Sequence, residues 1–275
     1  MDSVVESAII SAAATIFSVG ATATVAIVGF RISRSATDKT VAAARDTNQA
    51  TIDAAHADVR RTLDVTHREQ VGDRYLRAVE QLGSGMLEVR IGAIYALERV
   101  TVDSATDHPI VMEVLAAFIR ERSREPWPIP EPNISPARAH AFPRPDVQAA
   151  LTVIGRRNVG CDRGQIDLTA AVLPGALMFG ADLTRVRLVS ADLRGAVVHS
   201  GTKFTDAKLV NADLSGADLT DADLTRADLT GAILTGTNLT GARWPEKVPV
   251  PKGWVQDSGL ARLRQSRSDA NDSSA

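Results

Sequence analysis

The chain lacks most of the features that mark enzymes and secreted proteins. Its 275 residues include one cysteine, Cys161, which excludes an internal disulfide and indicates a reducing compartment. Aromatic residues make up only 4% of the sequence. The sequence contains no Walker loop, no dinucleotide-binding glycine fingerprint and no nucleophile elbow. We therefore expect a protein that is not an enzyme, with no catalytic residues and no cofactor.

An excess of charge of either sign is also lacking. The formal net charge is −2 and 44% of the residues are hydrophobic, which excludes a disordered chain and a strongly basic nucleic-acid binder. The five histidines are scattered along the chain. His56 and His67 share one face of a helix, but their separation along the axis of about 16 Å is too large for one metal ion. We expect no metal site and no direct nucleic-acid contact.

The chain does contain a five-residue repeat, which runs from Ile166 to Trp244. A large apolar residue returns every fifth position, with one extra residue before Phe204, and a small residue stands two positions before most of these centres. A period of five fits neither an α-helix nor a flat strand. It fits a solenoid that turns a corner every five residues, with the central residues filling its axis. The expected core includes Leu183, Leu193, Leu209, Leu214, Leu219, Leu224, Leu229, Leu234 and Leu239.

This stretch resembles the pentapeptide-repeat family, whose motif is a small residue, Asp or Asn, Leu and two variable residues. The match is clearest in Ala217-Asp218-Leu219-Thr220 and the units that follow it. The resemblance implies a right-handed, four-sided β-helix over residues 158–244. The extra residue predicts a bulge or a loosened corner between His199 and Phe204. The whole chain looks like the membrane-attached members of this family from high-GC actinobacteria, which carry a helical middle domain.

The amino-terminal run from Ala8 to Phe30 holds no charged residue in 23 positions, enough to span a bilayer. Arg31, Arg34 and Lys39 follow it, which places the carboxyl-terminal bulk in the cytoplasm. A cleaved signal peptide is the first alternative, but acidic residues precede the run, which is the wrong charge for one. A buried helix is the second. We expect a single-pass anchor of the cell membrane over residues 1–34.

Residues 35–82 are rich in alanine and charge and contain no proline, which predicts a long helix. Ile52, Ala55, Val59 and Leu63 form a narrow apolar stripe on this helix. The stripe leaves two interpretations open. The segment is either a solvated helical stalk or the contact of a parallel homo-oligomer.

Residues 83–157 predict a small α-helical domain, whose spacing resembles HEAT-type repeats. Its long central helix over residues 87–100 is apolar around most of its circumference, and we expect it to be buried. Asp107 and Asp146 are the expected N-caps of two further helices. Seven prolines within residues 125–145 indicate an extended loop there. Residues 245–275 should form a cap, with Trp254, Leu260 and Leu263 covering the open end of the solenoid, and a disordered tail.

The leading hypothesis for function is a membrane-tethered protein-interaction scaffold, which uses the solenoid faces to bind another protein. The candidate surface is the acidic row Asp213, Asp218, Asp223 and Asp228, although these residues could equally serve only to keep the solenoid soluble. The alternative is a DNA-mimic regulator of DNA gyrase of the quinolone-resistance type, which the resemblance suggests. Nine acidic and seven basic side chains in the repeat leave a net charge of only −2, far below that of a DNA duplex.

The five-residue phase also predicts which side chains stack. The four aspartates fall on four different sides, and residues twenty positions apart should lie in register. Asp213 should then meet Ile233, and Asp218 should meet Asn238. On the amino-terminal side of the extra residue, Asp213 should pair with Asp192 and Asp206 with Arg185.

Overall fold

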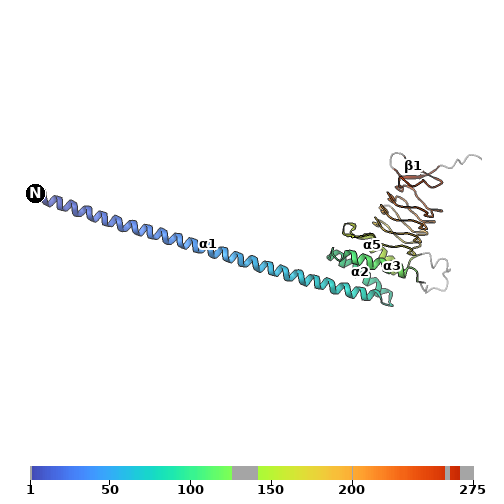
Figure 1. Ribbon diagram of the computed structural model, residues 1–275, viewed down its shortest axis with the longest axis horizontal. Coiled ribbons are helices and arrows are strands. Elements are labelled where there is room, and N and C mark those ends of the chain that lie inside the picture. The colour runs from blue at the N-terminus through green and yellow to red at the C-terminus, as the bar shows by residue number, and fades with distance from the viewer. Residues whose placement is uncertain (1, 126–141, 200, 258–260, 267–275) are drawn as a thin grey trace, which may run out of the picture. The chain divides into compact units, whose positions relative to one another are not determined.

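The computed structural model describes residues 2–125, 142–199, 201–257 and 261–266, with side chains from residue 39 onward. The helices are α1 (Asp2–Leu82), α2 (Leu87–Asp103), α3 (His108–Arg122) and α5 (Pro145–Arg156), followed by the short 3-10 helix η1 (Val159–Cys161). A stack of coils follows, and the short strands β1 (Trp254–Gln256) and β2 (Leu263–Gln265) close it (Figure 1). The chain divides into two compact units, residues 1–68 and residues 69–275.

Helix α1 contains both the predicted anchor and the predicted stalk. Where its side chains are described, they are exposed from residue 39 to residue 70, as a helix without packing partners would be. The second unit begins at residue 69, within the predicted stalk, and Val71, Ala78 and Leu82 are buried in its core. Among the residues whose side chains are described, no helix is long and apolar enough to cross a bilayer. The uncharged run over residues 8–30 lies outside them.

Helices α2, α3 and α5 pack against one another and form the helical domain. Ile94, Leu97, Leu115, Ile119 and Ile154 are fully buried between them. Apolar side chains of all three helices and of the end of α1 belong to one core, which continues into the solenoid.

Three local predictions for this domain need correction. Helix α2 buries only one face, since Tyr95 is 44% and Val102 is 71% exposed. Asp107 occupies the N-cap position of α3 but forms no side-chain capping bond. Asp146 is not a cap, because α5 begins at Pro145 and the Asp146 carboxylate is buried against α2. The predicted proline-rich loop falls for the most part on residues 126–141, outside the described residues.

The repeat stretch is a four-sided solenoid of parallel coils. Asp167 bridges to Arg187, and Asp218 bridges to Asn238, so that residues 20 positions apart lie in register. Pairs that straddle the extra residue are 21 positions apart, as in Asp182 with Lys203. The predicted irregularity therefore lies between His199 and Phe204, where Thr202 turns its hydroxyl inward and donates to the Met178 carbonyl at 2.5 Å.

The corner residue of each repeat unit adopts a positive φ, which an L-residue reaches at some cost. At two glycine corners a larger residue would have to displace a side chain of the adjacent coil. A Cβ atom at Gly231 would lie 2.2 Å from the Asn211 Oδ1, and one at Gly241 would lie 2.2 Å from the Asp221 Oδ1. The side chain of the coil below occupies the space in both cases. Glycine at these corners thus allows adjacent coils to approach closely.

The predicted leucines line the axis of the solenoid. Eight of the nine are buried, namely Leu183, Leu193, Leu209, Leu214, Leu219, Leu224, Leu229 and Leu239. Leu234 is half-buried, and its neighbour Ile233 is 49% exposed. Ile233 bridges to Asp213 below it, and in the described part of the chain no bridge extends from it to a further coil. The axis is therefore less well covered on this side of the carboxyl end.

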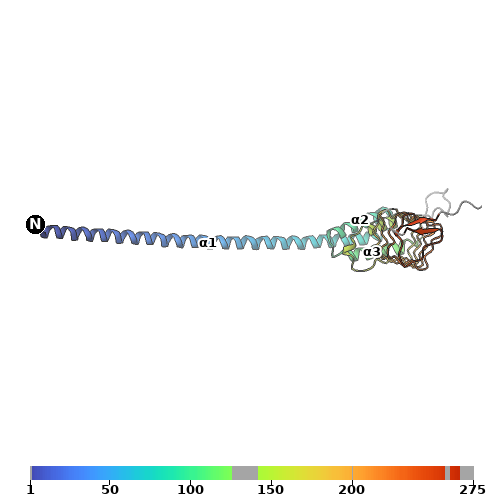
Figure 2. The same ribbon diagram turned by 90° about the horizontal axis from the view of Figure 1, so that it is seen from above.

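The helical domain lies against the first coil of the solenoid, at its lower end in Figure 1, and helices and coils overlap in the view of Figure 2. The Gln148 side chain accepts from the Leu177 N–H at 3.0 Å and donates to the Leu177 carbonyl at 2.8 Å. The buried Arg157 guanidinium donates to the Asp182 and Thr184 carbonyls. These side chains replace the missing neighbouring coil, so that the strand edge does not present free backbone groups.

The carboxyl end of the solenoid is covered by the β1–β2 hairpin. Arg243 of the last coil bridges to Arg262, just before β2, in an antiparallel manner. Leu263 is buried and Trp254 is half-buried, as the expected cap requires. Leu260 and the tail from residue 267 lie outside the described residues. Both ends of the solenoid thus pair with elements of the same chain.

Candidate functional site

The four aspartates of the predicted surface perform a local structural role. In each case the carboxylate accepts a hydrogen bond from the backbone N–H two residues later. The acceptor-to-donor distances are 3.0 Å for Asp213 with Ser215, 3.1 Å for Asp218 with Thr220, 2.9 Å for Asp223 with Thr225 and 3.2 Å for Asp228 with Thr230. These bonds hold the chain at the corner after each central leucine, which explains why the motif uses Asp or Asn there.

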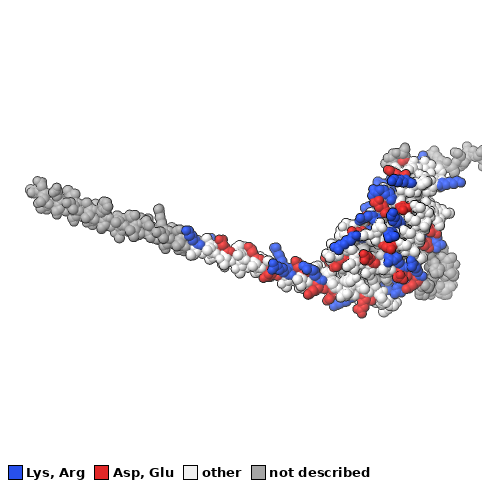
Figure 3. All heavy atoms as spheres, viewed as in Figure 1, with Lys and Arg blue, Asp and Glu red and all other residues white. Residues whose placement is uncertain are grey.

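Each of these aspartates also faces a basic side chain on an adjacent coil. The pairs are Asp213 with Arg194 at 3.8 Å, Asp218 with His199 at 3.9 Å, Asp223 with Arg243 at 3.8 Å and Asp228 with Lys208 at 3.7 Å. Figure 3 shows acidic and basic atoms interspersed over the visible side of the solenoid. The row is therefore not a concentrated acidic surface.

The turn bonds also affect the ionisation of two of these carboxyl groups. The hydrogen bond with the Ser215 side chain is the main cause that holds the pKa of Asp213 below its ordinary value. The hydrogen bond with the Thr230 side chain acts in the same way on the pKa of Asp228. Both groups are therefore ionised at neutral pH, with part of their hydrogen-bonding capacity already used.

The predicted stacking register is present. Asp213 bridges to Ile233, Asp218 to Asn238 and Asp192 to Asp213. Asp206 follows Arg185 by 21 positions, the same offset as in the flanking bridges of Asp182 with Lys203 and of Arg187 with Lys208. Its carboxylate forms a two-point contact with Arg226, at 2.7 Å and 2.5 Å, and Arg185 acts on it at longer range. Asp206 thus turns toward the carboxyl-terminal neighbour in its column.

The side of the solenoid that carries Asp218 also holds exposed apolar side chains, on the coils that precede it. Leu177 is 43% and Phe179 is 58% exposed, and Leu177 bridges to the half-buried Val197 on the next coil. The Phe179 ring stacks on the His199 ring, with centroids 5.4 Å apart and an interplanar angle of 9°. We call Leu177, Phe179, Val197 and His199 the Phe179 patch.

Sequence reasoning missed the Phe179 patch, although the chain offered a signal. Leu177 and Phe179 flank the central Met178, so that three large apolar residues are consecutive where the repeat pattern requires only the middle one. Val197 and His199 lie 20 positions later, which places them beside Leu177 and Phe179 on the next coil of the same side. The Gln148 side chain forms two hydrogen bonds with the Leu177 backbone, which fix the position of the strand edge at the patch.

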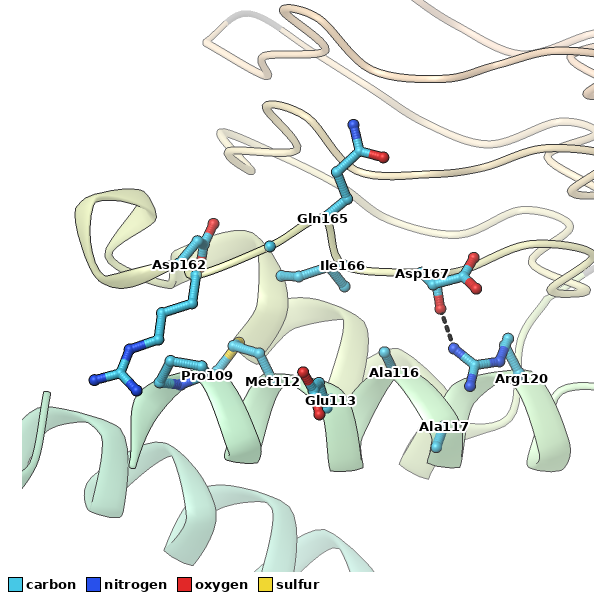
Figure 4. A pocket seen from close by; sticks show the side chains of 12 residues that line it. Pro109, Met112, Glu113, Ala116, Ala117, Arg120, Asp162, Gln165, Ile166 and Asp167 are labelled. Carbon is cyan, nitrogen blue, oxygen red and sulfur yellow. Dashed lines mark hydrogen bonds between the residues drawn. The ribbon is translucent and has the colours of Figure 1, made fainter. Parts of the chain in front are cut away.

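Two clefts flank the junction between the helical domain and the solenoid. The larger, of about 460 Å³, lies between α3 and residues 162–167 (Figure 4). Its wall is closed by Arg120, which donates to the backbone carbonyl of Asp167. The smaller, of about 340 Å³, is lined in part by His108, Arg157 and Cys161. The His108 Nε2 lies 3.1 Å from Asp162, which also accepts from Arg157, so these groups form a buried structural cluster.

Within the described residues, no three His, Cys, Asp or Glu side chains are placed to hold a metal ion. Every buried side-chain nitrogen or oxygen atom in the same part of the chain has a hydrogen-bond partner. We take the Phe179 patch, which is exposed and apolar, as the candidate site.

Comparison with known proteins agrees with this architecture. The family model "Pentapeptide repeats" matches residues 165–198 and 202–241 in eight copies. Among solved structures, a pentapeptide repeat protein from Nostoc Pcc 7120 is 34% identical over 30% of this chain and 77% of its own, with a TM-score of 0.20. One from the thylakoid lumen of Arabidopsis thaliana is 31% identical over 36% of this chain and 77% of its own, with a TM-score of 0.16.

A more distant match is QnrB1, a plasmid-mediated fluoroquinolone resistance protein. It is 25% identical over 28% of this chain and 39% of its own, with a TM-score of 0.17. No curated protein sequence matches the chain. The five-residue repeat, its four-sided coils and the family-model match lead to one conclusion: the chain belongs to the pentapeptide-repeat family.

Proposed function

We propose that this protein is a non-enzymatic protein-interaction scaffold that is tethered to the membrane and binds another protein through the Phe179 patch. One observation carries the proposal. Phe179 and Leu177 are exposed on a surface whose other large side chains are mostly charged and paired. Exposed apolar side chains that gather in one patch mark interaction sites.

The chemistry of the patch favours a protein partner over a nucleic acid. Aromatic side chains contribute strongly to protein interfaces because they bury a large area at low cost in side-chain entropy. The Phe179 and His199 rings are already stacked, so little order is lost when a partner covers them. The expected partner presents an aliphatic or aromatic side chain to this ring pair, surrounded by polar groups.

The tether is supported by the amino-terminal sequence. Ala8 to Phe30 contains no charge, and Arg31, Arg34 and Lys39 follow it. A run of this length matches the hydrocarbon thickness of a bilayer, and basic residues stay on the cytoplasmic side. The proposed location is therefore the cell membrane, with a single pass and with the helical domain and solenoid in the cytoplasm.

The DNA-mimic alternative has less support. A duplex mimic needs rows of unpaired acidic groups, whereas the aspartates of this solenoid are tied into turns and face basic side chains on adjacent coils. The Asp206 carboxylate, for example, is occupied by the Arg226 guanidinium. These pairs cancel the field that would attract a DNA-binding enzyme.

The interaction is tested by affinity capture with the full-length chain and two variants. Phe179→Asp should lose the bound partner, whereas Thr235→Ala, a change at the equivalent exposed position of another side, should retain it. Both variants should unfold at the wild-type temperature because neither side chain is buried. Equal capture by all three proteins would show that the Phe179 patch is not the docking site.

The tether has a separate test. The full-length chain should sediment with membranes and resist carbonate extraction, and a chain that starts at Ser35 should remain in solution. Release of the full-length chain by carbonate would contradict the anchor and leave the Phe179 patch unaffected.

A further inference from the structure

The exposed part of α1 contains an 11-residue repeat of its own. Residues 41–51, 52–62 and 63–73 align with Val41, Ile52 and Leu63 at the first position. The fourth position holds Ala44, Ala55 and Thr66, and the fifth holds Arg45, His56 and His67. The eighth position holds Asn48, Val59 and Gln70. The repeat differs in period from the solenoid and continues through more than two full units.

These positions define one stripe along the helix. Eleven residues make three turns, so the first, fourth and eighth positions face the same side. The 11-residue stripe comprises Val41, Ala44, Asn48, Ile52, Ala55, Val59, Leu63 and Thr66. None of these residues is charged, although residues 39–68 include Lys39, Arg45, Asp46, Asp53, Asp58, Arg60, Arg61, Asp64 and Arg68. The charged residues of this segment therefore lie on the other sides of the helix.

Among the described residues 39–68 of the first compact unit, the stripe has no packing partner. Ile52 is 48%, Val59 is 57% and Leu63 is 63% exposed, and every described residue from 39 to 68 is exposed. A single helix in water obtains most of its stability from packing of such a face. A repeating stripe of this kind is matched best by a helix with the same repeat, because the contacts then recur at every unit. That helix is available in a second copy of this chain.

We infer that the 11-residue stripe binds the same stripe of a second copy of this chain, with the two helices parallel and in register. The borders of the stripe support this direction. One border carries Arg45, His56 and His67, and the other carries Thr51 and Thr62. In a parallel pair each border faces the opposite border of the partner. In an antiparallel pair the Arg45 border would face itself, which places its basic side chains opposite one another and not opposite the threonines.

Asn48 supports the same arrangement. In a parallel pair in register, Asn48 faces Asn48 of the second copy, and the two amides can bond to each other. In an antiparallel pair centred on the stripe, Asn48 would face Val59 and lose its hydrogen-bonding partner. An 11-residue period has 3.67 residues per turn, so the pair should coil with a right-handed twist.

Disulfide cross-linking of the full-length chain tests this contact. Cys161 is first replaced, as Cys161→Ser, to remove the native thiol. Ile52→Cys and Leu63→Cys should each form a disulfide-linked dimer under mild oxidation. Ala57→Cys, on the opposite side of the helix, should remain a monomer. Equal cross-linking at residue 57, or none at residues 52 and 63, would overturn the proposal. Cross-linking only between mixed Val41→Cys and Leu63→Cys chains would overturn the parallel direction.

Mass measurement provides an independent readout. In mild detergent, the wild-type chain should have twice the protomer mass of 29.2 kDa. The double variant Ile52→Asp/Leu63→Asp should have the protomer mass, and the matched control Ala57→Asp should keep the dimer mass. A wild-type chain of protomer mass at micromolar concentration would contradict the inference. Because the stripe lies outside the second compact unit, capture of a partner by the Phe179 patch should be the same for all three chains.

Discussion

The guanidinium of Arg90 donates to the carboxylate of Asp146 across 2.7 Å, and the two side chains are 4% and 0% exposed. This pair joins α2 to α5 inside the helical domain. Arg90 also donates to the Ser84 carbonyl at 2.8 Å, and Arg144 reaches the same carboxylate. Because α5 holds Gln148 and leads directly into Arg157, which both bond to the first coils, the pair also helps to position the cap of the solenoid.

Removal of one member of this pair should destabilise the protein strongly. Asp146→Ala leaves the Arg90 charge buried without its partner, which should lower the free energy of unfolding by about 3–5 kcal/mol. The control is Arg156→Ala, which breaks a largely exposed pair between the same two helices, Arg156 with Glu98 at 3.0 Å, and should cost less than about 1 kcal/mol. Urea denaturation measures both. Similar losses for the two variants would contradict the structural role of the buried pair.

Stability should fall in acid, with Asp146 as one source. Burial alone would raise the pKa of Asp146, but hydrogen bonds from Arg90 and Arg144 outweigh it and hold the pKa below its ordinary value. The contribution of Asp146 is thus complete above the unfolded-state pKa of about 3.9 and is lost as the pH falls through the lower folded-state value. The stability difference between wild type and Asp146→Asn should be constant from pH 7 to 5 and shrink below about pH 4. A constant difference throughout would refute this linkage.

The five-residue phase can be tested inside the solenoid. Leu224 is fully buried, so Leu224→Ala should cost about 2–5 kcal/mol through lost burial and the cavity that remains. Thr225 is half-buried at an outward position, and its backbone N–H keeps its bond to Asp223 when the side chain is removed. Thr225→Ala should therefore stay within about 0.5 kcal/mol of wild type. Equal costs in thermal or urea unfolding would mean that the phase is wrong.

The helical domain should be needed to keep the solenoid monomeric. A fragment of residues 158–275 lacks Gln148 and Arg157, which bond to the backbone of Leu177, Asp182 and Thr184. Its exposed strand edge should pair with other copies and form aggregates, as unprotected edges do. A fragment of residues 69–275 retains the cap and should elute as a monomer. Light scattering distinguishes the two, and a monomeric 158–275 fragment would show that the edge is protected in another way.

Binding to the partner should depend only weakly on salt. The Phe179 patch is apolar, and the nearest acidic residue in its column, Asp218, faces His199. An affinity measured with the full-length chain should therefore change by less than about tenfold between 50 and 200 mM salt. A loss of several decades would indicate a concentrated charged surface and would restore the DNA-mimic alternative.

Much of the solenoid follows from local sequence alone. A large apolar residue at every fifth position can be buried only if the chain turns a corner at each unit. The leucines Leu183 to Leu229, the register of Asp213 with Ile233 and the irregularity before Phe204 all follow from counting positions. The structural role of the aspartates could not be predicted by counting positions. It depends on the distance from each carboxylate to the N–H two residues later and to the cation on the next coil.

Only the tertiary structure brings distant segments together. Leu177 and Phe179 become a patch because Val197 and His199 stack on them one coil later, and the Gln148 amide becomes a strand cap because α5 ends beneath that coil. Asp146 was predicted to be a helix N-cap, because only its neighbours in the sequence could be considered as partners for its carboxylate. Its true partner, Arg90, lies 56 residues away. Sequence determined the repeating core because burial of a periodic residue is a local requirement, whereas the contacts of polar side chains are decided by neighbours that only folding supplies.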